Sequence, residues 1–308
     1  MPSTTISVSV PTPELRDAVL ELTSNATLLE WDMSGPPPDP RIDIVVPPYM
    51  SPASLLKSLD HVDTRLVQSQ MVGYDGVEDV LPTGLVFANA KSVHETSTAE
   101  LVLALVLASQ RGIPDFVRAS DEGHWAPAWH QGLADHTVLL VGYGGVSQAI
   151  ESRLSGFEVT IERIAFTPRD DQRGTIHGIA DLHRLLPFAD VVIVVVPLSP
   201  STTGLIDDTF LSLMRERSLL VNVSRGPVAV TDALVAHARS GRIRLALDVT
   251  DPEPLPDGHP LFALPNVLIS PHVGGRTSAM VPRMARLIAK QVDLMQRSEE
   301  PINVVLTS

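Results

Sequence analysis

One short stretch constrains this chain more than any other: a glycine-rich turn between an apolar run and a helical pattern. It reads "VLLVGYGGVSQAI" over residues 138–150. Gly142 permits a tight turn, Gly144 lets a pyrophosphate approach the backbone, and the helix N-terminus that follows stabilises negative charge. Ser147 replaces the third glycine of G-x-G-x-x-G, but it is small enough to keep helix and strand close. A plain tight turn is the competing interpretation; the flanking strand and helix favour dinucleotide binding.

Alternating strand and helix patterns on both sides of this turn predict an α/β protein. Before it, runs such as "ISVSV" and "DIVV" alternate with helical patterns from about Glu14 and near Leu55. After it come "VTIERIAF", "VVIVVV", "SLLVNVSR", "RLALDV" and "NVLISPH", again separated by helices. This rhythm is typical of parallel sheets covered by helices. Because the 308 residues exceed one typical domain, we expect two doubly wound, Rossmann-like domains.

An apolar helix is predicted between these two series, in "STAELVLALVLASQRG". Ser97 and Glu100 form a capping-box pattern, and Gly112 fits a C-terminal stop. Since apolar residues occupy nearly every face, we expect the helix to be buried on all sides, at a domain or subunit junction. A last helix is predicted from about Thr277 to Arg297, and the tail "PINVVL" is too short for a domain of its own.

Charge and composition exclude several classes of protein. The net charge of −13 argues against nucleic acid or an anionic membrane as partner. No apolar run reaches the roughly 20 residues that span a bilayer, no secretion signal is recognisable, and the absence of cysteine rules out disulfides and thiolate chemistry. We therefore expect a soluble cytoplasmic protein. His124, His130 and His136 are spaced six residues apart, which fits no common metal-ligand pattern, so no metal is expected.

The second strand of the nucleotide-binding half bears on the choice between NAD and NADP. An acid about 20 residues after the first glycine would bind a free ribose hydroxyl, and counting reaches Glu162. That residue falls inside "VTIERIAF", whereas the strand ends in "AFTPR" without an acid. Thr167, with Arg169 and Arg173 beyond it, suits a 2′-phosphate better, so NADP is favoured over NAD. The alternative is that the two arginines are simply solvated.

Three segments, "NVSRGP", "DVTDPEPLP" and "SPHVGG", follow strands of the second half. Ligands of open parallel sheets bind beyond the carboxyl ends of strands, so Arg225, Glu253 and His272 are expected to converge there. An arginine fork binds a carboxylate, a histidine exchanges protons near neutral pH, and a nearby carboxylate orients the ring. A surface arginine, a loop acid and a capping histidine are the separate alternatives.

Together, "VGYGGVS", "NVSRGPVAVTDAL", "ALDVTDPEPLP" and "NVLISPHVGG" are similar to motifs of the D-isomer-specific 2-hydroxyacid dehydrogenase family, and the resemblance covers nearly the whole chain. It implies that Arg225 binds the substrate carboxylate, that His272 is the catalytic acid and base, and that Glu253 pairs with His272. The implied activity is hydride transfer between NAD(P)H and C2 of a small 2-oxo acid or D-2-hydroxy acid.

The resemblance also implies the domain organisation. Residues 1–92 plus 277–308 would form a substrate-binding domain and residues 93–276 an NAD(P)-binding domain, with the active site in the cleft between them. "MVGYDGVE" is similar to the family's substrate loop, in which N–H groups around Val72 and Gly73 meet the carboxylate. An ordinary strand-to-helix turn is the alternative for this loop.

The candidate cofactor contacts combine both lines of reasoning. By the resemblance, Val146 faces the pyrophosphate, Pro197 and Thr202 border the adenosine, and Asp248 and Gly274 lie near the nicotinamide. Val223 precedes the candidate arginine, and Thr98 is a weaker match that a helix start explains equally well. The full set is Thr98, Gly142, Gly144, Gly145, Val146, Thr167, Arg169, Pro197, Thr202, Val223, Asp248 and Gly274.

Partners and alternatives complete the sequence-based hypothesis. The resemblance implies a homodimer, and Trp125 and Trp129 fall near the family's dimer contact, where they close a partner's site or pack in the core. Tyr49 and Met50 line the substrate pocket or form a loop turn. Formate oxidation is disfavoured, since relatives with that activity carry an amide in place of Glu253. An NAD(P)-sensing binding protein or corepressor on the same fold is the alternative from another class.

Overall fold

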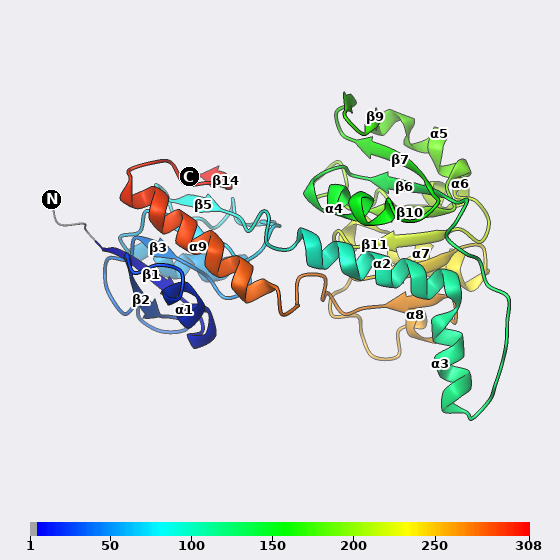
Figure 1. Cartoon of the computed structure of the whole chain (residues 1–308), viewed down its shortest axis with the longest axis horizontal. Coiled ribbons are helices and arrows are strands. Elements are labelled where there is room, and N and C mark those ends of the chain that lie inside the picture. Colours follow the sequence, from blue (N-terminus) through cyan, green and yellow to red (C-terminus); the bar gives the residue numbers. More distant parts are fainter. Residues whose placement is uncertain (1–4) are drawn as a thin grey trace. The chain divides into compact units, whose positions relative to one another are not determined.

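The computed structural model describes residues 5–308 and contains two compact units (Figure 1). The first runs up to His94 and resumes from Arg276 to Ser308, and the second is Glu95–Gly275. The sequence analysis placed these junctions at residues 92/93 and 276/277; residues 1–4 of its first domain lie outside the described part. No helix within residues 5–308 is long and apolar enough to cross a membrane.

The first unit is a six-stranded sheet in the order β14-β5-β4-β3-β1-β2. All pairs are parallel except β14 with β5. Helices cover both faces, because one buried cluster joins α1 and α9 to the sheet and another joins the 3₁₀ helix η1 to it. The elements are β1 Ile6–Val10, α1 Pro13–Leu20, β2 Ala26–Glu30, β3 Ile44–Val45, η1 Ala53–His61, β4 Leu66–Gln68, β5 Val86–Ala88, α9 Met280–Gln296 and β14 Val304–Thr307.

The C-terminal tail forms a strand that the sequence analysis did not predict. In β14, Val304 pairs with Ala88 and Leu306 with Phe87 of β5. The Ser308 hydroxyl also accepts a hydrogen bond from the Leu85 N–H at 3.0 Å. The tail therefore completes the edge of the first sheet.

The second unit is an eight-stranded sheet in the order β13-β12-β11-β10-β6-β7-β9-β8, parallel except for the β8–β9 pair. From β6 the chain winds outward first to β7 and later, starting at β10, in the other direction, so the topological switch point lies between β6 and β10. The strands are β6 Thr137–Val141, β7 Thr160–Ala165, β8 Arg169–Asp171, β9 Gly174–Gly178, β10 Val191–Val194, β11 Leu219–Asn222, β12 Arg244–Leu247 and β13 Val267–Ile269.

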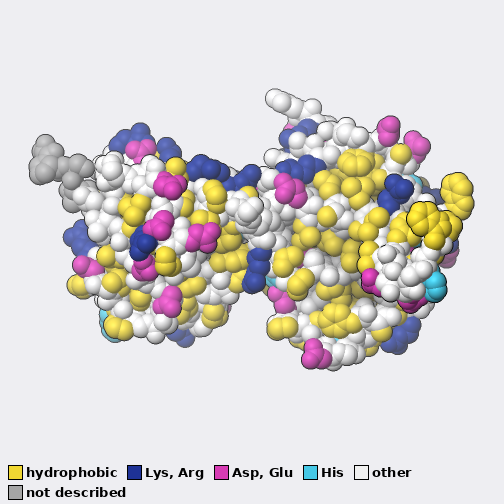
Figure 2. All heavy atoms as spheres, turned by 60° about the horizontal axis from the view of Figure 1, so that its bottom comes forward, with side chains coloured by type: hydrophobic (Ala, Val, Ile, Leu, Met, Phe, Trp, Pro, Cys, Tyr) yellow, Lys and Arg dark blue, Asp and Glu magenta, His cyan; other side chains and the backbone are white. Residues whose placement is uncertain are grey.

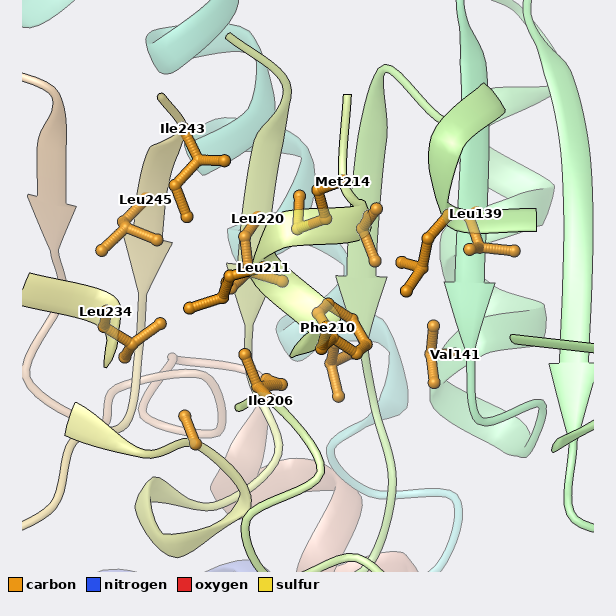
Figure 3. Close-up of a cluster of buried hydrophobic side chains, with 14 of the residues drawn as sticks. Leu139, Val141, Ile206, Phe210, Leu211, Met214, Leu220, Leu234, Ile243 and Leu245 are labelled. Atoms are coloured by element: carbon orange, nitrogen blue, oxygen red, sulfur yellow. The ribbon is translucent and has the colours of Figure 1, made fainter. Parts of the chain in front are cut away.

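Helices cover both faces of this sheet, which explains why its strands are apolar without alternation. Leu139 and Val141 of β6 join one buried cluster, and Val138 and Leu140 join the other. In the first cluster, side chains around α6 lie against those of the strands (Figure 3). The helices are α2 Glu95–Arg111, α3 Ile113–Asp121, α4 Gly145–Leu154, η2 Ile179–Asp181, α5 Leu182–Leu185, η3 Leu186–Phe188, α6 Asp208–Leu213, η4 Gly226–Val228, α7 Thr231–Arg239 and α8 Pro260–Ala263.

The predicted apolar helix is α2, with two differences. It begins at Glu95, so Ser97 lies inside the first turn and is not the cap. Glu100 and Ala104 are exposed in the single chain, so the chain itself does not bury the helix on all sides. Burial of these positions at a subunit junction stays a prediction. Gly112, at φ 63°, ends the helix as predicted.

Candidate active site

The glycine turn after β6 leaves open space at the start of a helix. Gly142 has φ +91°, and an added Cβ would collide with the Val195 carbonyl oxygen just beyond β10. Gly144 is the N-cap of α4; in the described part of the chain an added Cβ there would meet no atom within 4 Å, and no side chain caps the helix. The buried Ser147 donates its hydroxyl to the Gly142 carbonyl and so ties helix to turn. An exposed, uncapped helix N-terminus at the switch point fits a pyrophosphate.

Beyond β7 the chain forms a hairpin, β8–β9, that returns to this turn. Glu162 lies inside β7, as expected, and Thr167 is exposed after the strand. The Arg169 guanidinium donates from Nη2 to the Tyr143 carbonyl oxygen at 3.0 Å, and Nη1 of Arg173 donates to the Tyr143 hydroxyl at 3.2 Å. The structure thus brings both predicted arginines to the glycine turn.

The imidazole of His272 contacts the carboxylate of Glu253. Nδ1 lies 2.6 Å from Oε1 of Glu253. Because a carboxylate only accepts, the Nδ1–H group donates the hydrogen bond. Nε2 makes no hydrogen bond within residues 5–308, and 23% of the side chain is exposed. His272 also has φ +51°, an uncommon backbone conformation that clusters at functional sites. The pair leaves one ring nitrogen available to a ligand.

Asp248, after β12, holds the loop that carries this histidine. The carboxylate is buried and accepts three hydrogen bonds: Oδ1 from the Ser270 hydroxyl (2.7 Å) and the Val273 N–H (2.9 Å), and Oδ2 from the Gly274 N–H (3.0 Å). The His272 N–H donates to the Asp248 carbonyl at 2.8 Å. Both carboxylate oxygens are therefore engaged within the protein, so Asp248 fixes the loop whether or not it also contacts a cofactor.

Arg225 follows β11, the strand beside β12, and β12 in turn pairs with β13. The three candidate residues thus lie beyond the carboxyl ends of three neighbouring strands. An added Cβ on Gly226 would collide with the Thr250 carbonyl, so the backbone after Arg225 packs directly on the segment leading to Glu253. Nη1 of Arg225 donates to the Ser224 carbonyl at 2.7 Å.

The remaining predicted cofactor residues lie at the same edge of the second sheet or beside it. Thr202 closes the loop after β10, because its hydroxyl donates to the Pro197 carbonyl at 2.7 Å and accepts from the Ser199 N–H at 2.8 Å. The Thr98 side chain of α2 lies beside Gly274. Gly145 and Val146 open α4, and Val223 directly follows β11.

The predicted substrate loop belongs to the first unit, where its carbonyl groups are occupied. Gln70, Met71 and Val72 accept hydrogen bonds from His94 Nε2 (2.6 Å), the Ala90 N–H (2.8 Å) and Asn89 Nδ2 (2.9 Å). The N–H groups of Val72 and Gly73 donate to no group in the described part of the chain. This fixed backbone presents two donors to a ligand.

The three histidines considered for metal binding lie in different surroundings. The His130 ring packs edge-on against Phe116, Nδ1 of His136 lies 2.8 Å from the Ala134 carbonyl, and His124 is exposed. Within residues 5–308, no group of three or more potential metal ligands is found.

The sequence analysis missed the side chains that support the glycine turn. The Tyr143 hydroxyl donates to the carboxylate of Glu151 in α4, and Arg163 of β7 donates to the same carboxylate from Nε at 3.0 Å. Burial, and then the hydrogen bond to Glu151, raise the pKa of Tyr143 above 10.0. Burial alone would raise the pKa of Glu151, but hydrogen bonds from Arg163 and Tyr143 lower it below 4.5. The "DDQRG" turn could have indicated the hairpin, whereas residues 143, 151 and 163 form no local pattern.

Comparisons with known proteins point to one family. Residues 103–274 match the family described as D-isomer specific 2-hydroxyacid dehydrogenase, NAD binding domain. The chain is 32% identical over 285 residues to glyoxylate reductase/hydroxypyruvate reductase of Homo sapiens, which covers 85% of this chain and 86% of that protein.

Two solved structures have similar folds over nearly the whole chain. A D-isomer specific 2-hydroxyacid dehydrogenase from Xanthobacter autotrophicus Py2, in complex with NADPH and MES, is 26% identical with a TM-score of 0.84 and covers 98% of both chains. An NADPH-dependent glyoxylate/hydroxypyruvate reductase from Sinorhizobium meliloti, in complex with NADP and malonate, is 26% identical with a TM-score of 0.79, covering 98% of this chain and 97% of that one.

Proposed function

The chain belongs to the D-isomer specific 2-hydroxyacid dehydrogenase family, and from this membership we propose that it is an NAD(P)-dependent oxidoreductase acting at C2 of a small 2-oxo acid or D-2-hydroxy acid. The relatives from Homo sapiens and Sinorhizobium meliloti are named for glyoxylate and hydroxypyruvate, so these are the first acids to test. When bound, the nicotinamide cofactor supplies the hydride in the reductive direction.

Three residues divide the remaining chemistry. Arg225 binds the carboxylate of the oxo acid through its guanidinium fork and polarises the neighbouring carbonyl. His272 donates the proton on Nε2 to the oxygen that becomes the hydroxyl. Glu253 accepts a hydrogen bond from Nδ1, which fixes the orientation of the ring.

The observation that carries this proposal is the 2.6 Å contact between His272 and Glu253 at the carboxyl ends of strands. A capping histidine would use its ring to satisfy nearby backbone groups. Here Nδ1 is held by a carboxylate, while Nε2 makes no hydrogen bond within residues 5–308. This arrangement suits proton exchange with a ligand.

The test follows the loss of NADPH absorbance, and separately of NADH, with glyoxylate, hydroxypyruvate and phenylpyruvate. His272→Ala should lower turnover by about 10²–10⁴-fold, the usual contribution of a general acid. His183→Ala, which removes an exposed histidine of α5, should leave turnover unchanged. Nicotinamide fluorescence should show that both variants still bind cofactor. Cofactor binding by the wild type without reduction of any oxo acid would contradict the proposal and favour a sensing role.

Glu253→Gln tests the pairing separately from the histidine itself. Replacing the carboxylate by an amide weakens the hydrogen bond that orients the ring, so kcat should fall by at least about tenfold while cofactor affinity is unchanged. Exposed Glu100 on α2 offers a matched control, and Glu100→Gln should leave kcat unchanged. A Glu253→Gln variant with the kcat of the wild type would contradict the assigned role.

We further propose NADP as the preferred cofactor. The positions of Arg169 and Arg173 at the glycine turn support this, because neither guanidinium lies within 4.0 Å of a carboxylate in the described residues. Val72 and Gly73 are proposed to donate N–H groups to the substrate carboxylate, which the absence of other acceptors for them supports. The cytoplasmic location stays a prediction.

We also propose a homodimer formed through α3 and the segment that follows it. Trp125 and Trp129 have relative exposures of 96% and 103%, and α3 buries none of its residues. Figure 2 shows hydrophobic side chains protruding at the end of the second unit that carries α3. Arg244 donates to the Ser109 carbonyl at 3.0 Å and to Oε1 of Gln131 at 2.7 Å, so the base of this segment is fixed.

Sedimentation velocity tests this interface. Trp125→Ser combined with Trp129→Ser should turn a dimer into a monomer, because two aromatic side chains that are exposed in the monomer would lose their burial against the partner. Phe262→Ser, which changes an exposed aromatic residue of α8, should leave the dimer intact. A wild type that sediments as a monomer would contradict the proposal.

A further inference from the structure

The residue inside the glycine turn, Tyr143, connects the turn to the β8–β9 hairpin. Its carbonyl oxygen accepts from Arg169 and its hydroxyl oxygen accepts from Arg173, at 3.0 and 3.2 Å. These two arginines stand at the start and just beyond the end of β8, Arg169–Asp171. One residue of the turn therefore sets the position of both guanidinium groups.

Tyr143 is itself held in place by buried charge. Its side chain is 5% exposed, and its hydroxyl donates to Glu151. The guanidinium of Arg163 holds both oxygens of that carboxylate, Oε2 from Nε at 3.0 Å and Oε1 from Nη2 at 2.5 Å, and lies 6.0 Å from the Tyr143 ring centroid. The oxygen of a phenol fixed in this way accepts from Nη1 of Arg173 at 3.2 Å.

The two arginines differ from Arg163 in having no carboxylate partner. Arg163 is neutralised by Glu151, whereas no ion pair of Arg169 or Arg173 lies within 4.0 Å in residues 5–308. Asp170 and Asp171 of the same hairpin accept instead from the Thr175 hydroxyl and the Arg173 backbone N–H. Two exposed guanidinium groups beside an uncapped helix N-terminus make this side of the turn suited to an additional anion.

We propose that Tyr143 is a positioning residue for cofactor selection: its hydroxyl orients Arg173 toward the 2′-phosphate of NADP. This inference rests on the proposed function, and it adds that a residue within the glycine turn contributes to the choice between NADP and NAD. The chemistry recognised is a phosphate monoester on the adenosine ribose. Tyr143 acts through Arg173 and does not touch that phosphate.

Dissociation constants for NADPH and NADH, from nicotinamide fluorescence, test the proposal without turnover, with 2′,5′-ADP and 5′-AMP as competing probes. Arg173→Ala should weaken the binding of NADPH and 2′,5′-ADP by about tenfold, as expected for the loss of one charge-assisted contact. The dissociation constants of NADH and 5′-AMP should change by less than about twofold. Tyr143→Phe keeps the carbonyl that holds Arg169, and it should weaken NADPH by about threefold to tenfold with the same selectivity. Arg184 is an exposed arginine of α5 that pairs with Asp181, and Arg184→Ala should change the affinity for neither NADPH nor NADH.

A double variant separates a positioning role from a merely structural one. If Tyr143 acts through Arg173, adding Tyr143→Phe to Arg173→Ala should cause no further loss of NADPH affinity. Equal weakening of both cofactors by Tyr143→Phe, or an unchanged NADPH preference, would overturn the proposal. Because Arg173 is exposed, its alanine variant should fold even if Tyr143→Phe does not, and unchanged NADPH affinity in it would also overturn the proposal. A wild type that binds neither cofactor would instead overturn the proposed function.

Discussion

At the scale of single residues, the two central glycines of the turn are needed for opposite reasons. Gly142 combines φ +91° with backbone atoms of Val195 that leave no room for a Cβ. At Gly144 an added Cβ would meet no atom of residues 5–308 within 4 Å. The fold therefore requires Gly142, whereas the space beside Gly144 is open and fits the proposed pyrophosphate.

This contrast gives a paired prediction. Gly142→Ala should lower the free energy of unfolding by at least about 1–3 kcal/mol, because the backbone must move and the new residue is strained. Gly144→Ala should leave the melting temperature within about 2 °C and weaken cofactor binding by about tenfold or more, because the methyl group occupies the place of the pyrophosphate. Thermal unfolding and cofactor titration of both variants measure this. Equal cofactor affinity in wild type and Gly144→Ala would place the pyrophosphate elsewhere.

Asp248 permits a second prediction at this scale. Asp248→Asn puts an amide where a buried carboxylate now accepts three hydrogen bonds, so one donor meets another donor. We expect a loss of about 1–3 kcal/mol of stability and a lower kcat, since the loop that carries His272 loses its support. Asp257→Asn, on an exposed loop of the same unit, is the comparison. Unchanged stability with altered cofactor affinity alone would assign Asp248 to the cofactor and not to the loop.

Sequence reasoning placed the strand-end residues because parallel strands deliver their carboxyl ends to one edge of a sheet. Arg225, Glu253 and His272 each follow a strand, so their location beyond the strand ends needed no knowledge of side-chain packing. Tyr143 could not be recognised in the same way. Its partners come from a helix and from the next strand, and only the tertiary structure brings them together.

At the scale of elements, α4 and β7 are joined by the buried pair of Glu151 and Arg163. The pKa of Glu151 is lowered in the folded protein, because hydrogen bonds from Arg163 and Tyr143 outweigh the effect of burial. A carboxyl with a lowered folded pKa contributes stability that is present above its unfolded pKa of 4.5 and is lost as the pH falls through the folded value.

The melting temperature of Glu151→Gln should therefore lie below that of the wild type at pH 7. The difference between the two melting temperatures should narrow as the pH falls below 4.5. Differential scanning calorimetry from pH 3 to pH 7 measures the two curves. Glu100 occupies an exposed position of α2, so the melting temperature of Glu100→Gln should follow that of the wild type over the same pH range. A constant gap between Glu151→Gln and the wild type down to pH 3 would show that the lost packing, and not the charge, causes the difference.

Sequence patterns identified the elements that carry a hydrophobic pattern, short strands such as β3 and β13 included, and missed the β8–β9 hairpin and β14. The glycine turn, the apolar strands of the second unit and the final helix all carry strong periodicity, and they were predicted within a few residues. The β8–β9 hairpin is three and five residues long and entirely polar at β8, so it has no hydrophobic pattern. Strand β14 forms only because β5 offers an edge, which the tail alone cannot reveal.

At the scale of the whole molecule, the two units use the chain differently. The second is one continuous segment, Glu95–Gly275, whereas the first needs both ends of the chain. Helix α9 supplies seven buried residues, Met284, Ala285, Leu287, Ile288, Gln291, Val292 and Leu294. Each large apolar side chain among them stabilises the fold by about 1.5–3 kcal/mol, so their sum approaches the total stability of a typical domain.

A chain that ends at Gly275 should consequently lose the first unit and keep the second. We expect limited proteolysis to digest residues before about Glu95 and to leave a resistant fragment that still binds NADPH, because the glycine turn, the hairpin and α4 all lie in the continuous segment. A chain ending at Glu300 is the matched control, since it keeps α9 and loses β14 together with residues 301–303, and its first unit should resist the protease. If the shorter chain is digested throughout, the second unit depends on the first for its stability, and cofactor binding then requires both ends of the sequence.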